Sequence, residues 1–454
     1  MSTIGRATAI SPDQSGNQLA GLLDQKDPGR IGDRLHAFIA ELYPLCRSIT
    51  GDGVRETLRV IGQHLPLKMH EIPSGTNVFD WTVPPEWNIR DAYVKDADGV
   101  RVIDFQRSNL HVVSYSQPVK ARMSLNQLKE HLFTLPDHPD WIPYRTTYYR
   151  KDWGFCLSHR AYERLREGEY EVVIDASMTS GSLTYGECLL PGETEDEVLV
   201  SAHVCHPSLC NDNLSGVAVA TFLGAYLLTL PRRYSYRFLF APTTIGAIAW
   251  LAHNEHRVSR VRHGLVLSCV GDSGKITYKR SRRGNAEIDR AAAHVLTSCG
   301  VEHKVVGFSP YGYDERQFCS PGFDLPVGCF MRTPNGQFPE YHTSADNLEF
   351  LKAEQLEDSF VNVLRILQAV DRNETYVNLQ PKGEPQLGKR GLYSAPGSGE
   401  NLALLWVLNL SDGKHSLLDI AERSGLSCEA IYRAAQLLVR GGLLERQRAP
   451  VSAE

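Results

Sequence analysis

The chain has 454 residues, of which 42% are hydrophobic and 22% are charged, and its formal net charge at pH 7 is -5. This is the composition of a globular protein, and the length predicts two or three domains. The small negative charge does not favour nucleic acid or a membrane surface as a partner. No apolar run reaches the roughly 18 residues that a membrane-spanning helix needs.

The first 27 residues are rich in Ser, Gly, Gln and Asp, which predicts a flexible polar tail over residues 1–27. They lack the basic and apolar segments of a signal peptide, so we expect a cytoplasmic protein. The ten cysteines include no CxxC pair, and we expect them to be reduced and mostly buried. The spacing of Cys205 and Cys210 matches no usual thiolate zinc site.

Residues 28–73 predict the first part of the main domain. Leu35, Phe38 and Leu42 recur at helical spacing, and a second helix follows the Gly-containing turn of residues 50–53. Residues 74–164 differ, because Trp, Tyr and Pro accompany short alternating runs such as "RVIDF". That texture predicts an inserted β-rich domain.

Residues 165–375 alternate apolar strands with helices and predict the rest of the main domain. The predicted fold class is α/β, with a mostly parallel mixed sheet and helices on both faces. In such sheets the chemistry gathers in loops beyond the carboxyl ends of the strands. His203, Thr243 and Asp272 fall in such loops.

A Pro/Gly-rich linker is predicted for residues 376–398, and a winged helix-turn-helix domain for residues 399–447, with Ser427 capping its third helix. The charge of this last domain is close to neutral, whereas DNA-binding proteins need a basic surface. We therefore expect a packing or oligomerisation module, a homo-oligomer, and no nucleic-acid partner.

Three residues predict a metal site. His203 ends an apolar strand, Asp212 lies in the following "DNLSG" turn, and His342 lies in the later segment "YHTSAD". Two imidazoles and a carboxylate can bind Zn²⁺ and leave a position for water. A single strand-end histidine is usually a packing residue, but two histidines and this turn in this order favour the metal site.

These segments resemble the zinc aminopeptidase superfamily, in which a strand-end His, an Asp in such a turn and a late "YHT" His bind zinc. The resemblance implies a metallo-hydrolase, but this sequence departs from it at several positions. Thr243 and Thr244 replace the family's Glu-Glu pair, which supplies the general base and a ligand. Ser268 replaces a ligand Asp, and Cys205 replaces the Asp after the first His. We therefore expect one zinc ion per chain, with Asp272 as an additional candidate ligand.

The chain also resembles, over nearly its whole length after residue 30, a bacterial group of aminopeptidase-like proteins with an inserted domain and a C-terminal winged helix. The matching segments include "LCRSITGDGVRET", "AHVCHPSLCNDNLSG", "YKRSRRGNAEID" and "DERQFCSPG". This resemblance implies the architecture more firmly than the reaction. Proteins of this group often accompany polysaccharide or natural-product gene sets.

A hydrolase would need a residue to accept the proton of its water. Glu315 is the first candidate for this general base, Glu187 the second and Glu340 the third, each with a surface role as the alternative. His206 is a candidate ligand, orienting partner or transition-state donor. For an anionic substrate group, the candidates are the arginines, which suit bidentate capture of a carboxylate or phosphate: Arg47, Arg280, Arg282 and Arg316. Tyr185 and Tyr313 are candidate oxyanion donors.

The leading hypothesis is a zinc-dependent amide hydrolase that acts on a small molecule or short peptide, such as an aminoacylated biosynthetic intermediate. One alternative is a metal-binding enzyme with non-peptidase chemistry on a small metabolite, which the loss of both family carboxylates motivates. Another is a catalytically inactive binding protein on the same fold. Amide screening separates the first two, and variants of His342 separate the third.

Overall fold

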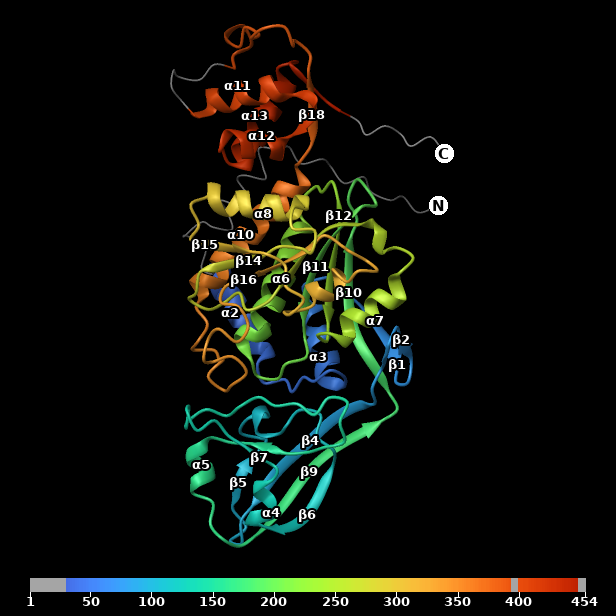
Figure 1. Ribbon diagram of the computed structural model, residues 1–454, viewed down its shortest axis with the longest axis vertical. Coiled ribbons are helices and arrows are strands. Elements are labelled where there is room, and N and C mark those ends of the chain that lie inside the picture. The colour runs from blue at the N-terminus through green and yellow to red at the C-terminus, as the bar shows by residue number, and fades with distance from the viewer. Residues whose placement is uncertain (1–29, 393–398, 448–454) are drawn as a thin grey trace. The chain divides into compact units, whose positions relative to one another are not determined.

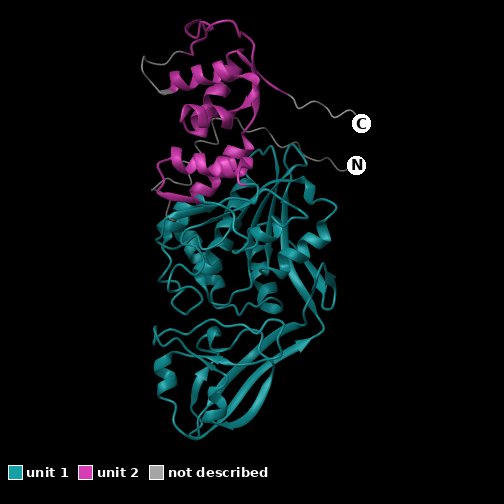
Figure 2. Ribbon diagram, viewed as in Figure 1, with its two compact units in different colours: residues 1–283, 306–360 teal, residues 284–305, 361–454 magenta. Residues whose placement is uncertain are grey.

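The computed structural model describes residues 30–392 and 399–447, so the predicted tail over residues 1–27 lies outside the described residues. The chain forms two compact units (Figure 2). The first unit comprises residues up to 283 and residues 306–360, and the second comprises residues 284–305 and the remainder from 361. Within the described ranges, no helix is both long and apolar enough to cross a membrane.

A mixed sheet forms the centre of the first unit (Figure 1). Seven of its strands have the order β1-β10-β12-β11-β13-β16-β14. Their bounds are β1 Lys68–Pro73, β10 Ser182–Leu190, β12 Ser235–Ala241, β11 Glu197–His203, β13 Val261–Leu267, β16 Val327–Met331 and β14 Ile276–Lys279. The neighbours β12, β11, β13 and β16 run parallel, whereas β1, β10 and β14 pair antiparallel at the sides. The predicted α/β class is confirmed.

Helices cover both faces of this sheet. Helices α7 and α9 pack on one face, in a core that includes Leu199, Leu239, Trp250 and Phe318. Helix α6 packs against β11, β12 and β13, with α2 beside it. The bounds are α2 Ile31–Leu42, α3 Asp52–Ile61, α6 Gly216–Leu227, α7 Ile245–Asn254, α9 Glu315–Phe318 and α10 Ala353–Asp371. Every residue of β11 and β12 is buried, as apolar strands covered on both faces require.

The inserted domain leaves the central sheet after β1 and returns to it at β10 (Figure 1). Its four-stranded sheet has the order β5-β4-β9-β6, with strands β5 Arg101–Asp104, β4 Glu86–Lys95, β9 Glu169–Thr179 and β6 Val119–Ser124. Smaller elements complete it: β2 Asn77–Val78, β3 Trp81–Thr82, α4 Leu125–Lys129, β7 Leu132–Phe133, β8 Phe155–Cys156 and α5 His159–Glu163. The insert is β-rich, but its central strand β9 lies beyond residue 164, where the sequence placed its end.

One loop of the insert packs against the main domain. Ile142 and Ser344 are joined by two hydrogen bonds, and the backbone N–H of Tyr144 donates to the carbonyl of His342 at 2.8 Å. Pro143 and Thr343 form an isolated antiparallel bridge between these hydrogen bonds. A short antiparallel seam therefore joins the insert to the loop that carries His342.

The second unit has its own hydrophobic core, which includes Leu404, Ile420, Ile431 and Leu438. Its three-stranded sheet has the order β18-β17-β19. The bounds are α8 Glu287–Ser298, β15 His303–Val306, β17 Thr375–Asn378, α11 Gly399–Leu410, β18 Asp412–Ser416, α12 Leu417–Ser424, α13 Cys428–Arg440 and β19 Leu444–Arg446. Ser427 caps α13 by accepting a hydrogen bond from the N–H of Ala430, as expected. Strand β17 lies in the segment where the sequence predicted a linker.

Candidate metal centre

Asp212 lies in an irregular helical turn, Cys210–Ser215, between β11 and α6. The turn is held by the fully buried carboxylate of Asp346, which accepts hydrogen bonds from the N–H groups of Asn211 at 2.5 Å and Asp212 at 3.0 Å. Burial raises the pKa of Asp346 to about 7, against the lowering effect of these backbone donors. The sequence analysis did not single out Asp346, although it belongs to the quoted segment "YHTSAD".

His203 is the last residue of β11, so the parallel strand carries its imidazole to the carboxyl edge of the sheet. Its Nε2 atom lies 3.1 Å from Oδ1 of Asp212, and the side chains of both residues are 1% exposed. The hydroxyl of Ser268, at the end of β13, lies 3.4 Å from the same Nε2.

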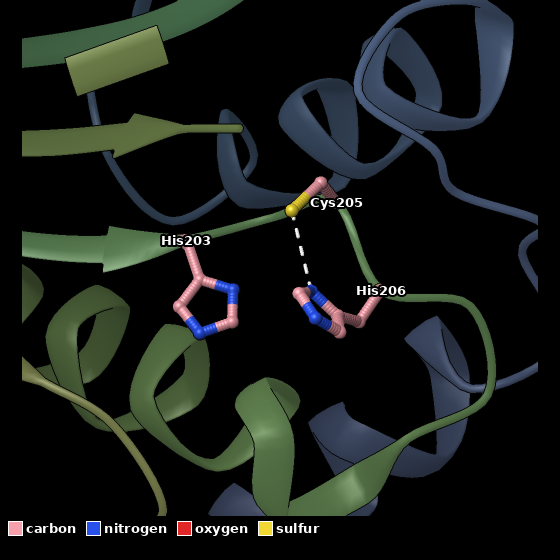
Figure 3. Close-up of side chains that lie close together, drawn as sticks. All are labelled: His203, Cys205 and His206. Carbon is pink, nitrogen blue, oxygen red and sulfur yellow. Dashed lines mark hydrogen bonds between the residues drawn. The ribbon is translucent and has the colours of Figure 1, made fainter. Parts of the chain in front are cut away.

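His206 follows in the loop after β11, with its ring beside that of His203 (Figure 3). Its Nε2 lies 3.9 Å from Oδ2 of Asp212. Its Nδ1 lies 3.2 Å from the thiol sulfur of Cys205 (Figure 3). The thiol therefore holds one nitrogen of this ring while the other nitrogen faces the carboxylate.

His342 reaches the same carboxylate from the loop before α10. Its Nε2 lies 3.0 Å from Oδ2 of Asp212, and its side chain is 34% exposed. The ring of Tyr341 stacks on that of His342, with centroids 3.9 Å apart, and the ring of Tyr144 meets it edge-on at 5.1 Å. His342 has a φ of +57°, an uncommon backbone conformation that the seam with Tyr144 helps to hold.

Burial and the neighbouring charges shift the pKa values of Asp212 and of two histidines beside it. Burial opposes ionisation of Asp212, but His206, His203 and His342 hold its pKa well below the usual value. Burial opposes protonation of His203, yet the hydrogen bond and charge of Asp212 raise its pKa to about 10. Burial lowers the pKa of His206 well below its usual value. An ionised carboxylate and a neutral imidazole are the forms that bind a cation, so binding of a metal ion would displace the proton that Asp212 favours on His203.

The donor set fits a zinc-type ion. Three imidazole Nε2 atoms converge on one carboxylate, and His206, Asp212 and His342 each offer a ligand atom within 4.8 Å of the others. Oδ1 of Asp212 is buried and lies 3.1 Å from Nε2 of His203, and Nδ1 of His203 lacks a hydrogen-bond partner among the described residues. A buried carboxylate surrounded by imidazole nitrogens is a set of ligand atoms that a zinc-type ion could bind. The same criterion groups His203, Cys205 and His206.

Asp272, the additional candidate ligand, lies outside this cluster. Its Oδ2 accepts hydrogen bonds from the side chain of Asn211 and from the N–H of Thr333, and its Oδ1 accepts from the hydroxyl of Thr333 at 2.6 Å. The loop after β13 does not turn back toward His203. Asp272 instead supports the loops around the site.

Two of the three candidate bases, Glu315 and Glu187, have carboxylates that pair with other residues. Glu315 is fully buried, and its Oε1 lies 2.7 Å from the ammonium of Lys279 on β14. Glu187, on β10, accepts hydrogen bonds from Arg237, Arg257 and the indole of Trp250. Both carboxylates therefore belong to buried ion pairs, and among the described residues neither contacts a histidine of the metal centre. Glu340, the third candidate, accepts hydrogen bonds from Thr343 through its backbone carbonyl.

Most of the candidate arginines do not face the cluster. Arg47 is 1% exposed; its Nε donates to the carbonyl of His206 at 2.9 Å, and burial lowers its pKa to about 10. Arg282 pairs with Asp324 on the surface, and the backbone of Arg280 bonds to Val306. Arg316 remains close to the site, because its Nη2 donates to the hydroxyl of Thr244 at 3.3 Å.

Of the two candidate tyrosines, Tyr313 lies beside the histidine cluster and Tyr185 does not. The ring of Tyr313 stacks on His203, with centroids 5.6 Å apart, and its hydroxyl lies 2.9 Å from the sulfur of Cys269. Tyr185 stacks on His70 in β1, away from the three histidines. The structure also brings in two groups that the sequence analysis did not single out, Tyr144 of the insert and Asp314.

A model of a domain of unknown function, DUF4910, matches residues 36–373, and a winged helix-turn-helix model matches residues 374–446. The chain belongs to the DUF4910 family. It is 52% identical over 425 residues to a Clostridium acetobutylicum protein, covering 92% of this chain and 98% of that protein. That protein is described as a candidate polysaccharide biosynthesis protein with an aminopeptidase-like domain.

Solved structures show the same fold for this DUF4910 chain. The crystal structure of a candidate peptidase from C. acetobutylicum is 50% identical, has a TM-score of 0.90, and is covered over 100% of its length by 96% of this chain. A zinc aminopeptidase from Bacillus subtilis has a TM-score of 0.56 at 13% identity, with 75% of this chain and 95% of that chain covered. A peptidase M28 precursor from Shewanella amazonensis has a TM-score of 0.54 at 12% identity, with 78% and 96% covered. The resemblance to aminopeptidase-like proteins with a C-terminal winged helix is confirmed.

Proposed function

We propose that this DUF4910 chain is a zinc-dependent amide hydrolase of aminopeptidase type, with one ion per chain held by His203, Asp212 and His342. The observation that carries the proposal is the convergence of three Nε2 atoms on the buried carboxylate of Asp212. His206 supplies the third of these nitrogens, so we assign it as a further ligand. Such an ion polarises a carbonyl group and lowers the pKa of a bound water toward about 7.

The protein's own groups keep these ligands in place. Asp346 holds the backbone of the Asp212 turn, Arg47 holds the carbonyl of His206, and Cys205 holds Nδ1 of the same ring. Partners of this kind fix the orientation of ligand side chains and raise metal affinity. The metal centre is therefore built from ligands together with buried groups that position them.

We propose a small amide, such as an aminoacylated biosynthetic intermediate, as the substrate. Support comes from the insert, whose Tyr144 packs against the rings of both His206 and His342 and so limits the room beside the ligands. Arg316 lies next to Thr244 and is the best placed of the candidate arginines to bind an acidic group. The polysaccharide-biosynthesis description of the C. acetobutylicum relative agrees with a small substrate rather than a protein.

One observation favours a second candidate, a metal-dependent enzyme with non-peptidase chemistry. Thr243 and Thr244 occupy the positions of the two carboxylates that the zinc aminopeptidases use for catalysis and metal binding, as the sequence resemblance indicates. A site that has lost both carboxylates has either replaced them or changed its reaction. Turnover assays decide between these outcomes.

The test begins with zinc content by elemental analysis of the wild type and the His203→Ala and His342→Ala variants. We expect about one zinc per chain in the wild type and loss of zinc in both variants. The matched control is His138→Ala in the insert, because His138 stacks on Trp141 and should not affect the metal. Zinc-loaded protein is then assayed with aminoacyl p-nitroanilides and dipeptides. Bound zinc without any turnover would favour the second candidate, and protein that takes up no zinc would contradict both.

A further inference from the structure

The turn after β12 carries Thr243 and Thr244 in place of two carboxylates, and both residues are bonded to a carboxylate from elsewhere in the chain. The hydroxyl of Thr243 donates to Oδ1 of Asp314 at 3.0 Å, and the N–H of Thr244 donates to the same oxygen at 2.7 Å. The two threonines that stand in place of the family's carboxylates are therefore hydrogen-bonded to another carboxylate, which lies 70 residues after Thr244 in the sequence.

Asp314 is 2% exposed, and one oxygen of its carboxylate, Oδ1, accepts the hydrogen bonds from both Thr243 and Thr244. Its second oxygen, Oδ2, accepts no hydrogen bond from the described residues. A buried carboxylate with one oxygen fixed and the other uncommitted can accept a proton or a water hydrogen bond without changing its position.

The surroundings of Asp314 place it beside the metal centre. The preceding residue, Tyr313, stacks on the ring of His203, and the charge of His203 acts on the Asp314 carboxylate. Thr243, which bonds to Asp314, also donates its N–H to the sulfur of Cys205 at 3.3 Å. Burial raises the pKa of Asp314, with His203 opposing the rise.

The next residue, Glu315, is also an acid, but its carboxylate has different partners. Its side chain leaves the first turn of α9 toward β14 and pairs with Lys279 at 2.7 Å, while its Oε2 is sealed without a partner. A carboxylate neutralised by a buried ammonium is a poor proton acceptor. Of the two consecutive acids, only Asp314 is joined by hydrogen bonds to the turn that lost the family's carboxylates.

We propose that Asp314 is the proton acceptor of the hydrolytic reaction, in place of the missing Glu pair. The inference rests on the proposed function. In the step, water loses a proton to Oδ2 of Asp314 as its oxygen forms a bond to the amide carbon. The same proton then passes to the departing nitrogen as the carbon–nitrogen bond breaks, giving a carboxylic acid and an amine. No oxidant, reductant or co-reactant other than water is needed.

The decisive variant is Asp314→Asn, because the amide oxygen can still accept both hydrogen bonds from Thr243 and Thr244 but the side chain cannot accept a proton. With the best substrate of the amide panel, we expect kcat to fall by about 10²–10⁴, with KM changed less than about threefold and one zinc retained by elemental analysis. Asp314→Ala should regain part of its kcat on addition of formate, a small carboxylate that can enter the vacated space.

The matched control is Glu315→Gln combined with Lys279→Met, which removes the neighbouring carboxylate together with its partner charge. Its kcat should stay within about threefold of the wild type. A kcat of Asp314→Asn within threefold of the wild type would overturn the inference, as would a rise in KM alone or loss of zinc. If wild-type protein with bound zinc hydrolyses no amide at all, the proposed function fails first, and the inference fails with it.

Discussion

His206 uses both nitrogens of its ring, one toward the thiol of Cys205 and the other toward Asp212. A ring held at Nδ1 presents Nε2 in one orientation, which is how second partners of metal-binding histidines raise affinity. The zinc aminopeptidases that the sequence resembles carry an Asp at the position of Cys205, so here a thiol stands where they have a carboxylate.

We predict that Cys205→Ala weakens zinc binding by about 10–100-fold, because the imidazole of His206 loses its orienting partner. The affinity is measured by competition with a chromophoric chelator. Cys329→Ala is the matched control, since Cys329 is equally buried but lies on β16. Equal zinc affinity in Cys205→Ala and wild type would show that the thiol does not position the ring.

A second residue-scale prediction concerns His263 on β13, which is buried against the ring of Tyr234. Burial, followed by the charges of Arg233 and Arg262, lowers its pKa to about 3. The unfolded chain binds a proton near the ordinary pKa of about 6.5, so the free energy of unfolding falls as pH drops below that value. At pH 5 the loss attributable to His263 is about 2 kcal/mol.

We expect His263→Phe to lack this part of the acid sensitivity. Urea unfolding at pH 7.5 and pH 5 measures it, and Tyr234→Phe, which keeps the histidine, should retain the wild-type dependence. A His263→Phe variant with unchanged pH dependence would contradict the assignment.

The candidate ligands of the proposed metal centre could be named from the sequence because each belongs to a local pattern, whereas the position of Asp314 could not be predicted. His203 ends an apolar strand, and Asp212 and His342 lie in turns with recognisable residues. The choice between Asp314 and Glu315 depends on which way consecutive side chains leave a single turn of α9, and no periodicity in the sequence fixes that direction. The sequence favours Glu315 because it lies in a polar loop shortly before His342, whereas in the structure its carboxylate pairs with Lys279 on β14.

At the scale of elements, three strands of the central sheet are joined by a buried ion-pair cluster. Arg237 on β12 makes a bidentate contact with Glu197 on β11 at 2.6 and 2.7 Å, and it contacts Glu187 on β10 at 2.9 Å. All three side chains are less than a tenth exposed. Removing the arginine alone would leave two buried carboxylates without this partner.

We predict that Arg237→Met lowers the free energy of unfolding by about 3–5 kcal/mol, because uncompensated buried charge is costly. Arg282→Ala is the control: its pair with Asp324 is largely exposed, and the cost should stay below about 1 kcal/mol. Denaturant unfolding measures both variants. A loss in Arg237→Met no greater than in the control would contradict a structural role for the cluster.

The elements themselves follow the sequence pattern closely, with one informative exception. Strands β11 and β12 read as continuous apolar runs and are buried on both faces. The run that contains Tyr170, Val172 and Ile174 alternates apolar and polar residues, and it becomes β9 of the insert, with one face buried. The boundary of the insert could have been placed after β9, because alternation is typical of a half-exposed antiparallel strand rather than a buried parallel one.

At the scale of the whole molecule, the winged helix-turn-helix invites a comparison with DNA-binding proteins. In α13, Arg433 pairs with Glu429, and Arg372 also pairs with Glu429. Because both arginines pair with Glu429, less positive charge is left to contact DNA phosphates.

We therefore expect no salt-sensitive binding of the full chain to duplex DNA in fluorescence anisotropy between 50 and 200 mM salt, a range in which a protein with roughly 6–10 phosphate contacts loses 10³–10⁵ in affinity. A poly-basic peptide of similar length serves as a positive control. Binding that weakens steeply with salt would contradict this expectation.

The insert is joined to the main domain both at its two ends and through contacts between loops, and this limits how such proteins can be recombined. Its two ends lie side by side, because Pro73 and Ser182 are paired in the central sheet, so its exchange between relatives would leave that junction undisturbed. A further contact is the seam between residues 142–144 and 342–344. In a chimera that carries the insert of a relative, the loop that contacts His342 would therefore come from that relative. Transfer of substrate specificity would require residues 142–144 and 342–344 to be exchanged together.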